Sequence, residues 1–332
     1  MKKILILGSG SFSGSSLINF LLRKNYKIFG INRTLKKNKY FLPFEKNIKK
    51  KNFTNFILDI NKIKDREMIY NIIKKNKINY IVDFLGQGMV SQSWDKPQDW
   101  VNTNILSKIN LIEKIIRQKI NIKKYIKIST PEVYGSVFGK IKKTNIYNPS
   151  TPYAVSHASI DMILKTYYEK YNFPIVIGRF SNFYGDHQQL YRIIPRVIFA
   201  VLKNGNFFLE GNGNSKRNFL YKDDFCNGIY LMLLKGKVNN IYHFSGKNVI
   251  SIKNLVTKIC KIMGCDKKAI VRYKKERSSL DKVYKMDTYK TRSKLNWSEN
   301  VSLEEGIKNT VNYMKNNFKL IKNLDPIYKH KK

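Results

Sequence analysis

The first residues of the chain decide its fold class. Residues 3–14 read KILILGSGSFSG, a short apolar run that ends in a cluster of glycine and serine. Apolar side chains then recur at Leu17, Phe20 and Leu21, which is helical spacing. A glycine cluster between a strand and a helix is the setting of a dinucleotide site, because the backbone approaches the pyrophosphate and the helix N-terminus faces its charge. The predicted contacts of this turn are Gly8, Gly10, Ser11, Phe12, Ser13 and Gly14.

The alternation of strands and helices continues along the first half of the chain. Apolar runs predict strands at residues 27–31, 56–59, 80–85, 125–128 and 174–179. Helical periodicity lies between them near 65–75 and 101–118, and returns at 153–171. Elements that alternate in this way form a parallel sheet with helices on both faces. The sequence therefore predicts an α/β protein with a Rossmann-type, doubly wound parallel sheet.

A change of pattern after residue 178 predicts a second, smaller unit. Glycine and polar residues increase around 204–218, the strands shorten, and amphipathic helices return near 251–263 and 302–316. We interpret this part as a smaller α/β substrate-binding lobe. The predicted division assigns 1–178 to the NAD(P)-binding Rossmann domain with a returning segment near 219–250, 179–218 and 251–325 to the substrate-binding lobe, and 326–332 to a frayed tail.

Further cofactor contacts are expected where the next strands end. The second strand ends at Asn32 and Arg33, where an acidic residue would bind the adenosine ribose of NAD. Arg33 instead favours a 2′-phosphate, and therefore NADP over NAD. Asp59 ends the third strand and Ile60 follows it; both are expected at the cofactor, with Asp59 at the adenine edge through its side chain or its turn. The turn after the fourth strand, with Leu85, Gly86 and Gln87, is able to pass under the nicotinamide ribose.

The chain is strongly basic. Its 332 residues include 63 Lys and Arg against 23 Asp and Glu, a net charge of +40. This balance is typical of nucleic-acid binding, but short lysine clusters are scattered through the chain and no nucleic-acid-binding motif accompanies them. Biased composition explains the charge better, so we expect no specific nucleic acid, although the field would attract an anionic substrate.

Neither a membrane span nor a metal site is expected from the sequence. No run approaches the roughly 18 apolar residues that a membrane span needs, and the N-terminal apolar run meets Gly8 too soon for a signal peptide. We therefore expect a cytoplasmic protein without membrane contact. Cys226, Cys260 and Cys265 lack the spacing of metal ligands, so we predict free thiols and no metal.

Groups suited to proton and hydride removal from a carbinol surround the end of the fifth strand. Ser129, Thr130 and Glu132 lie at its carboxyl end, where open α/β sheets place their ligands. Tyr153 then opens the helix at 153–171, and His157 lies on the same face one turn later. The apolar stripe of this helix, paired with the helix at 101–118, predicts a homodimer interface, although a core-facing stripe explains it equally well.

These residues resemble, over nearly the whole chain, an extended short-chain dehydrogenase/reductase of the nucleotide-sugar dehydratase and epimerase group. Residues 129–135, STPEVYG, are similar to the STDEVYG or STSELYG segment of nucleotide-sugar 4,6-dehydratases. Further ordered matches to that group are 182–185 (NFYG), 192–195 (RIIP), 211–217 (GNGNSKR), Arg277, Asp281 and 294–297 (KLNW).

The resemblance implies a reaction and a role for each matching residue. NAD(P) would take a hydride from C4 of the sugar, water would leave across C5 and C6, and the hydride would return to C6. Tyr153 would be the base at O4, Thr130 would hydrogen-bond O4, and Glu132 would remove the C5 proton. Ser129, Tyr153 and His157 would also contact the cofactor. The nucleotide-diphosphate sugar would be held by Gln87, Thr130, Asn182, Arg192, Arg217 and Arg277.

The expected function is therefore a 4,6-dehydratase of surface-polysaccharide or deoxysugar biosynthesis. Glu132 favours this reaction, because C4 epimerases of the group need no C5 base. A C4 epimerase or a 4-dehydrogenase of the same family is the first alternative, and a non-catalytic nucleotide-sugar binding protein is the second.

Three departures from the family pattern change these expectations. Ser11 replaces the middle glycine of the turn, and Pro131 replaces the aspartate that some dehydratases use as an acid. His157 replaces the lysine of the Tyr-x-x-x-Lys motif, which binds the nicotinamide ribose and lowers the tyrosine pKa. We expect His157 to be positive only part of the time near neutrality, which would make Tyr153 slower or more dependent on pH. The open alternative is that His157 only binds ribose or packs.

Overall fold

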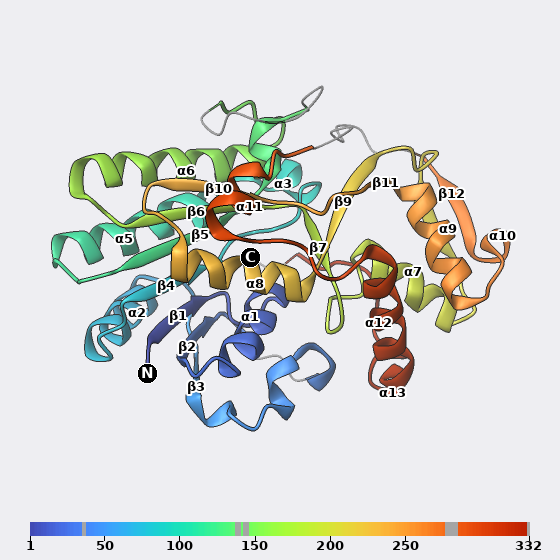
Figure 1. Cartoon of the computed structure of the whole chain (residues 1–332), viewed down its shortest axis with the longest axis horizontal. Coiled ribbons are helices and arrows are strands. Elements are labelled where there is room, and N and C mark those ends of the chain that lie inside the picture. Colours follow the sequence, from blue (N-terminus) through green and yellow to red (C-terminus); the bar gives the residue numbers. More distant parts are fainter. Residues whose placement is uncertain (35–37, 137–140, 142–145, 276–284, 331–332) are drawn as a thin grey trace.

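A seven-stranded parallel sheet forms the larger part of the protein (Figure 1). The computed structural model describes residues 1–34, 38–136, 141, 146–275 and 285–330. The strands, in spatial order, are β10 (Asn240–Phe244), β6 (Ile175–Phe180), β5 (Lys124–Ser129), β4 (Tyr80–Asp83), β1 (Lys3–Leu7), β2 (Lys27–Asn32) and β3 (Phe53–Ile57). Every neighbouring pair runs parallel. The predicted Rossmann-type sheet is confirmed, and the order reverses between β1 and β4, where such sheets bind ligands.

Helices cover both faces of this sheet. One face carries α1 (Phe12–Leu22) and α8 (Lys222–Lys235), and the other carries α2 (Ile63–Lys75), α5 (Ser107–Arg117) and α6 (Pro152–Tyr171). Ile4 and Ile6 of β1 pack into the core on the α1 side, while Leu5 and Leu7 pack into the core on the α5 side. All four side chains are fully buried, as expected for a parallel strand covered on both faces.

Two predicted elements differ from the observed ones. The third strand begins at Phe53 and ends at Ile57, so its predicted range of 56–59 is wrong. It ends early because Asp59 accepts a hydrogen bond from the backbone N–H of Asn61 and starts a turn. The helix predicted at 101–118 is divided into α4 (Pro97–Val101), a π-helical segment η4 (Asn102–Leu106) and α5. Because a π-helical turn contains more residues than an α-helical turn, side chains in it point in directions that α-helical periodicity does not predict.

The smaller lobe lies to the right in Figure 1. It contains a three-stranded sheet of β7 (Asn182–Tyr184), β9 (Lys216–Tyr221) and β11 (Val249–Ser251), and a parallel pair of β8 (Phe207–Glu210) and β12 (Val271–Lys274). Helices α7 (Ile193–Leu202), α9 (Ile252–Met263) and α12 (Leu303–Asn316) enclose a separate apolar core. The shorter elements of the chain are η1 (Lys39–Phe41), η2 (Pro43–Lys46), η3 (Lys50–Asn52), α3 (Gln92–Asp95), η5 (Pro131–Tyr134), α10 (Lys267–Ile270), α11 (Tyr289–Leu295) and α13 (Phe318–Ile321).

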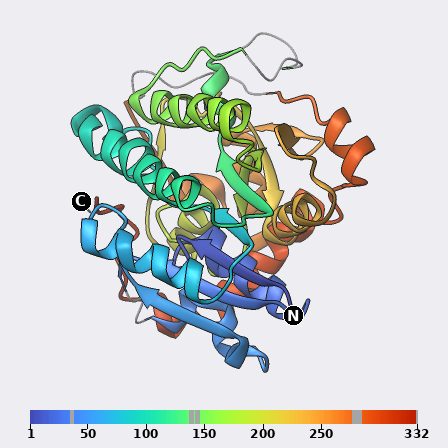
Figure 2. The ribbon, with the colours of Figure 1, turned by 90° about the vertical axis from the view of Figure 1, so that its left-hand side faces the viewer.

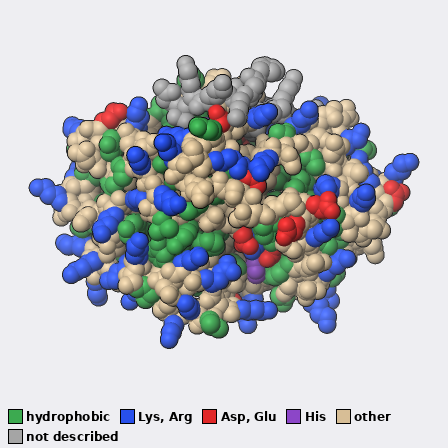
Figure 3. All heavy atoms as spheres, in the orientation of Figure 1, with side chains coloured by type: hydrophobic (Ala, Val, Ile, Leu, Met, Phe, Trp, Pro, Cys, Tyr) green, Lys and Arg blue, Asp and Glu red, His purple; other side chains and the backbone are tan. Residues whose placement is uncertain are grey.

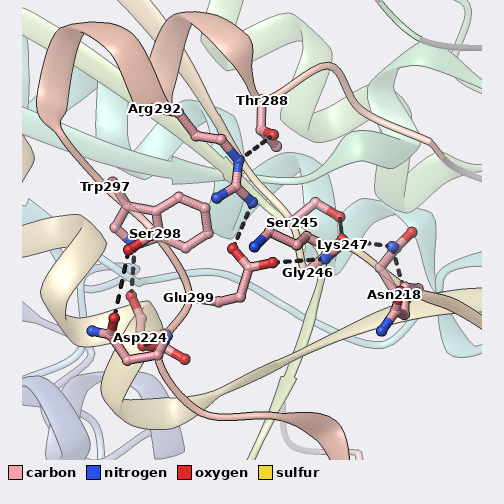
Figure 4. Close-up of polar contacts among 12 residues, drawn as sticks. Asn218, Asp224, Ser245, Gly246, Lys247, Thr288, Arg292, Trp297, Ser298 and Glu299 are labelled. Atoms are coloured by element: carbon pink, nitrogen blue, oxygen red, sulfur yellow. Dashed lines mark hydrogen bonds and ion pairs between the residues drawn. The ribbon is translucent and has the colours of Figure 1, made fainter.

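The segment that follows α11 packs against the Rossmann domain through its tryptophan (Figure 4). Trp297 is buried, and its indole N–H donates to the carbonyl of Asp224 on α8 at 3.1 Å. Its ring also meets Phe244 of β10 edge to face, with centroids 5.1 Å apart. Arg292 covers the other side of the indole and pairs with Glu299 at 2.5 Å. Assigning all of 251–325 to the lobe is therefore wrong for this segment, because its tryptophan fills the core between α8 and β10.

The C-terminal tail is packed up to residue 330. The His330 ring stacks on Trp100 of α4, with centroids 5.2 Å apart, and its Nε2 lies 2.8 Å from the Asp99 carboxylate. Tyr328 packs against Tyr191 at 5.1 Å. Figure 2 shows the C-terminal end beside the helical run at 97–117. A frayed tail from residue 326 is therefore wrong for 326–330, because aromatic contacts hold it.

Basic side chains spread over the face of the molecule shown in Figure 3. They alternate there with hydrophobic and uncharged groups instead of gathering in one stripe. A nucleic-acid-binding surface concentrates Lys and Arg on one face or along one helix. The visible distribution is that of a generally basic surface. No helix in the described part of the chain has the length and apolar composition to cross a membrane.

Candidate active site

A cleft of about 1180 Å³ opens at the carboxyl edge of the sheet, beside the lobe. Its lining combines the turns after β1, β4 and β5 with the start of α6, the start of α7 and parts of β7 and β9. The predicted residues in this lining are Ser11, Phe12, Ser13, Leu85, Gly86, Gln87, Ser129, Thr130, Glu132, Tyr153, His157, Asn182, Arg192 and Arg217. The fold thus brings predicted cofactor, catalytic and substrate residues to one place.

The remaining predicted residues lie outside this lining. Gly8, Gly10 and Gly14 belong to the turn between β1 and α1. Asn32 ends β2 and is followed by Arg33, while Asp59 and Ile60 follow β3. The Asp59 carboxylate shapes the turn that leads to α2, so this residue can meet an adenine through its turn and less through its side chain. Arg277 and Asp281 lie outside the described residues.

The turn after β1 fits a pyrophosphate. Ser11, which replaces a glycine of the family pattern, caps α1: its Oγ accepts from the N–H of Gly14 at 2.9 Å and donates to the carbonyl of Gly8 at 2.7 Å. A Cβ on Gly14 would lie 2.3 Å from the Gly8 carbonyl, and one on Gly10 would overlap the Asn32 side chain. The glycines therefore permit a close backbone turn, and the N-terminus of α1 is left to face an anion.

Asn104 holds the turn after β4 and was not predicted from the sequence. Its Oδ1 accepts from the N–H of Gln87 at 2.8 Å, and its Nδ2 donates to Ser156 on α6 at 2.9 Å. Asn104 is almost fully buried and lies in the π-helical segment η4. The available signal was a polar side chain inside a helical pattern, but only the π-helical turn directs it toward Gly86 and Gln87.

Thr130, Glu132 and Tyr153 converge on the cleft. Thr130 is the N-cap of η5, and its Oγ1 accepts from the N–H of Glu132 at 3.3 Å. Burial and the neighbouring Glu132 carboxylate raise the pKa of the Tyr153 phenol well above its ordinary value. A hydrogen bond with Thr130 and the charge of Arg192 lower that pKa. Pro131 is buried beneath them in η5 and offers no acid.

His157 lies against a lysine that was not predicted from the sequence. Its ring centroid is 4.7 Å from that of Tyr153, and its Nδ1 is 3.4 Å from the Nζ of Lys127 on β5. Burial, and next the charge of Lys127, keep the pKa of His157 well below its ordinary value. Because the ring is desolvated beside a cation, the structure favours a neutral imidazole over the partly positive one that was expected from the sequence.

Ser129 is held by a buried ion pair. Its hydroxyl donates to Asp161 of α6 at 2.7 Å, and the same carboxylate oxygen accepts from Arg179 of β6 at 3.0 Å. Arg179 and Asp161 are both fully buried. The guanidinium also lies over the rings of Tyr134 and Tyr147. The hydroxyl of Ser129 is thus directed inward, which leaves its backbone to face a cofactor.

Polar side chains for an anionic ligand face the cleft from the lobe. Asn182 of β7 and Arg192 before α7 are exposed, and Arg217 of β9 is half-buried. Tyr328 of the C-terminal tail also lines the cleft, and the charges of Arg192 and Arg33 act on its phenol. The tail therefore lies between the predicted substrate side and the adenosine side, which the sequence pattern did not indicate. No metal-binding group of three or more His, Cys, Asp or Glu side chains occurs among the residues that the structure describes.

The fold is that of an extended short-chain dehydrogenase/reductase, the class to which nucleotide-sugar dehydratases and epimerases belong. Within this class the chain belongs to the GDP-mannose 4,6-dehydratase family, whose sequence model matches residues 5–310. It is therefore an enzyme of the nucleotide-sugar dehydratase and epimerase group. The family resemblance that was predicted from the sequence is confirmed by this match.

Three known proteins show how far the likeness extends. A dTDP-D-glucose 4,6-dehydratase of Dictyostelium discoideum is 28% identical over 368 residues, covering 96% of this chain and 82% of that protein. The crystal structure of dTDP-glucose 4,6-dehydratase from Bacillus anthracis, in complex with NAD, has a TM-score of 0.86 at 26% identity and covers 98% of this chain and 100% of its own. UDP-glucose 4-epimerase of Thermotoga maritima, with UDP-glucose, has a TM-score of 0.84 at 26% identity, covering 95% and 99%.

Proposed function

We propose that this enzyme is an NAD(P)-dependent nucleotide-sugar 4,6-dehydratase. The observation that carries this proposal is the position of Glu132, whose carboxylate acts electrostatically on the Tyr153 phenol inside the cleft. C4 oxidation needs a base such as Tyr153, whereas a second base is needed only when a proton is removed at C5. A carboxylate beside the phenol supports elimination over simple epimerisation.

The residues present fit a dinucleotide cofactor. The cap formed by Ser11 and the close backbone turn that Gly10 and Gly14 permit suit a pyrophosphate, and the turn held by Asn104 suits a nicotinamide ribose. When bound, the dinucleotide supplies the redox chemistry by accepting a hydride from C4 and returning it at C6. The protein's own part is to hold that group against the wall formed by Tyr153 and His157.

The proton transfers are assigned to three side chains. Tyr153 takes the O4 proton as the C4 carbonyl forms, and Thr130 holds O4 and the phenol in one hydrogen-bonded arrangement. The C4 ketone makes the C5 proton acidic, and Glu132 removes it. Because Pro131 has no acidic proton, the protonated Glu132 then donates to the C6 hydroxyl as water leaves. When the hydride returns to C6, C5 takes up a proton, and the release of the O4 proton from Tyr153 balances this uptake.

The substrate diphosphate and nucleoside are assigned to the lobe side of the cleft. Arg192 and Arg217 offer guanidinium groups whose fork of donors suits phosphate oxygens, and Asn182 adds an amide. Gln87 lines the opposite wall. Arg277 keeps its predicted role as a further phosphate or nucleoside contact. The net charge of +40 favours capture of such an anion.

Mass spectrometry of the products tests the proposal. The enzyme is incubated with NAD or NADP and a panel of GDP-, dTDP-, UDP- and CDP-hexoses. A dehydratase lowers the mass of one sugar by one water. A Glu132→Gln variant, with Glu67→Gln on the exposed face of α2 as its control, identifies the base that removes the C5 proton. An unchanged mass with interconverted C4 stereochemistry would overturn the dehydratase assignment.

A C4 epimerase or 4-dehydrogenase is the second candidate. The observation in its favour is that the Thermotoga maritima epimerase is nearly as similar in structure as the Bacillus anthracis dehydratase. A 4-dehydrogenase would lower the product mass by two hydrogens. A non-catalytic nucleotide-sugar binding protein would leave every sugar unchanged and show no reduced nicotinamide.

The finer assignments complete the proposal. We assign the enzyme to cytoplasmic surface-polysaccharide or deoxysugar synthesis, with a nucleotide-diphosphate sugar as its partner and neither a specific nucleic acid nor a membrane. NADP is favoured over NAD by Arg33, although the Bacillus anthracis structure contains NAD. A homodimer through the helical run at 97–117 and α6 is supported by exposed apolar side chains on both, namely Val101, Leu106, Val155 and Met162.

A further inference from the structure

Lys127 occupies an unusual position for a lysine. It lies in β5, in the interior of the parallel sheet, with only 1% of its surface exposed. Its side chain is on the same face as Tyr125, toward α5 and α6. The Nζ donates to the carbonyl of Ile128 and lies 3.4 Å from His157 Nδ1. Burying an ammonium in such a place is costly, which calls for a role beyond packing.

The buried carboxylates of this region already have other partners. Asp83 pairs with Lys108 at 2.7 Å, and Asp161 pairs with Arg179 at 3.0 Å. Lys127 therefore adds a third cation to a cluster that contains two carboxylates. With its amine protonated, the cluster carries one positive charge in excess, and the imidazole of His157 separates that charge from Tyr153.

We propose that Lys127 positions His157 and holds, one hydrogen bond behind the imidazole, the positive charge that supports the Tyr153 phenolate. This inference rests on the proposed function, because it assigns the charge to a reaction in which Tyr153 is the base. The positive charge then comes from a lysine of strand β5. In the family pattern it comes from a lysine four residues after the tyrosine, the position that His157 occupies here.

The chemistry of the two groups fixes the imidazole tautomer. An ammonium is a donor only, so Nδ1 of His157 must accept from Lys127. The proton of the neutral ring then resides on Nε2, which becomes a donor for a ribose hydroxyl or for the phenolate. Lys127 therefore fixes the orientation of the His157 ring through Nδ1 and leaves Nε2 to face the cleft. The hydrogen-bond partner of a metal-ligating histidine acts on the ring in the same way.

The groups facing Lys127 make its charge sensitive to pH near neutrality. Burial, and next the Lys108 ammonium, lower the pKa of Lys127 to about 7, while Asp83 and Asp161 act in the opposite direction. Arg179 faces the same His157 ring from β6 and keeps the pKa of that ring low together with Lys127 and Lys108. The ammonium is therefore formed at pH values well below 7 and is lost as the pH rises through that range.

The first experiment needs neither cofactor nor substrate. Nitrogen-15 NMR of the four histidine rings reports their tautomers, and the His157 signals are identified by their loss in His157→Gln. At pH values well below 7, wild-type His157 is expected as the Nε2–H tautomer. Lys127→Arg should retain it, whereas Lys127→Met should yield a mixture of tautomers. An unchanged His157 spectrum in folded Lys127→Met would overturn the proposal.

Lys124 offers a matched control in the same strand. It is a half-buried lysine whose Nζ donates to the carbonyls of Met232 and Leu233, away from the cleft. Lys124→Met therefore removes an equivalent side chain without touching His157. Its His157 spectrum should equal that of the wild type. A change equal to that of Lys127→Met would show a general effect of strand β5 and would also overturn the proposal.

The second experiment measures the reaction. Lys127→Met should lower kcat about 10- to 100-fold, the usual effect of removing a group that orients a site residue, with a smaller change in KM. The double variant Lys127→Met with His157→Lys returns an ammonium to the site and should recover most of that loss. No recovery in a folded double variant would overturn the charge role. If wild type dehydrates no sugar while the NMR result holds, the proposed function fails and the Lys127–His157 contact stands.

Discussion

The Ser129 hydroxyl donates a 2.7 Å hydrogen bond to Asp161, one helical turn beyond His157 on α6. This bond joins the end of β5 to the helix that carries Tyr153, so it ties together two walls of the cleft. Arg179 shares the same carboxylate oxygen and is fully buried. The relative position of the two walls therefore depends on a buried ion pair.

Asp161→Asn is expected to destabilise the enzyme by about 3–5 kcal/mol, because it leaves the buried Arg179 charge without its carboxylate. Urea unfolding of the wild type and the variant measures this difference. The control is Glu169→Gln, which breaks the exposed pair with Lys165 on the same helix and should cost at most about 1 kcal/mol. Equal stabilities of the two variants would contradict the importance of the buried pair.

Glu132→Gln should separate oxidation from elimination. The amide cannot remove the C5 proton, so dehydration is expected to fall about 10²- to 10⁴-fold, the usual contribution of a positioned base. Oxidation at C4 depends on Tyr153 and should continue, visible as a single turnover of nicotinamide absorbance. Stopped-flow absorbance and product mass measure the two steps. Loss of both steps together would show that Glu132 serves the oxidation instead.

Thr130→Val should move the pH dependence of the reaction to higher pH. The active form of Tyr153 is deprotonated, and burial raises its pKa, so the rate is expected to rise as the pH rises. Thr130 lowers that pKa through its hydrogen bond, and valine cannot replace the bond. The alkaline-rising limb of kcat/KM should therefore shift upward in Thr130→Val. A limb that stays in place would mean that another group sets it.

The sheet was predictable because its strands are short, continuous runs of apolar residues. Residues 3–7 contain four fully buried side chains, and their sequence leaves little alternative to a strand covered on both faces. The positions of the candidate catalytic residues were predictable for a related reason, since Thr130 lies at the end of a strand and Tyr153 at the start of a helix. The residues that contact them in space were harder to predict from the sequence.

Contacts between distant parts of the chain were the part that the sequence could not supply. Lys127 interrupts an apolar strand, which signals a buried partner, but only the packing of α6 on β5 identifies that partner as His157. Asn104 reads as an ordinary helical residue, and a π-helical turn directs it to the cleft. The tail residue His330 carries no motif, and its place is set by the ring of Trp100.

Arg33 should determine which dinucleotide is preferred. It follows β2 at the edge where an acidic residue would bind a ribose hydroxyl and where a guanidinium suits a 2′-phosphate. Arg33→Asp is therefore expected to weaken NADP binding about tenfold or more relative to NAD, since it exchanges an attraction for a like-charge repulsion. Tryptophan fluorescence titration of each dinucleotide measures the two affinities. An unchanged ratio of the NADP and NAD affinities would show that Arg33 does not contact the dinucleotide.

The exposed apolar residues of α4, η4 and α6 should lie in a homodimer interface. Met162 is 45% exposed, and Val101 and Leu106 of the neighbouring helical run are exposed to a similar degree. Figure 2 shows α5 and α6 across the same side of the sheet.

Met162→Glu introduces a charge that a second copy would have to bury, so the dimer should dissociate to monomers in sedimentation velocity. Met68→Glu on α2 makes the same change at an equally exposed site outside this surface and should leave the dimer intact. A wild type that sediments as a monomer would contradict the interface, and the apolar stripe of α6 would then be explained by the core alone.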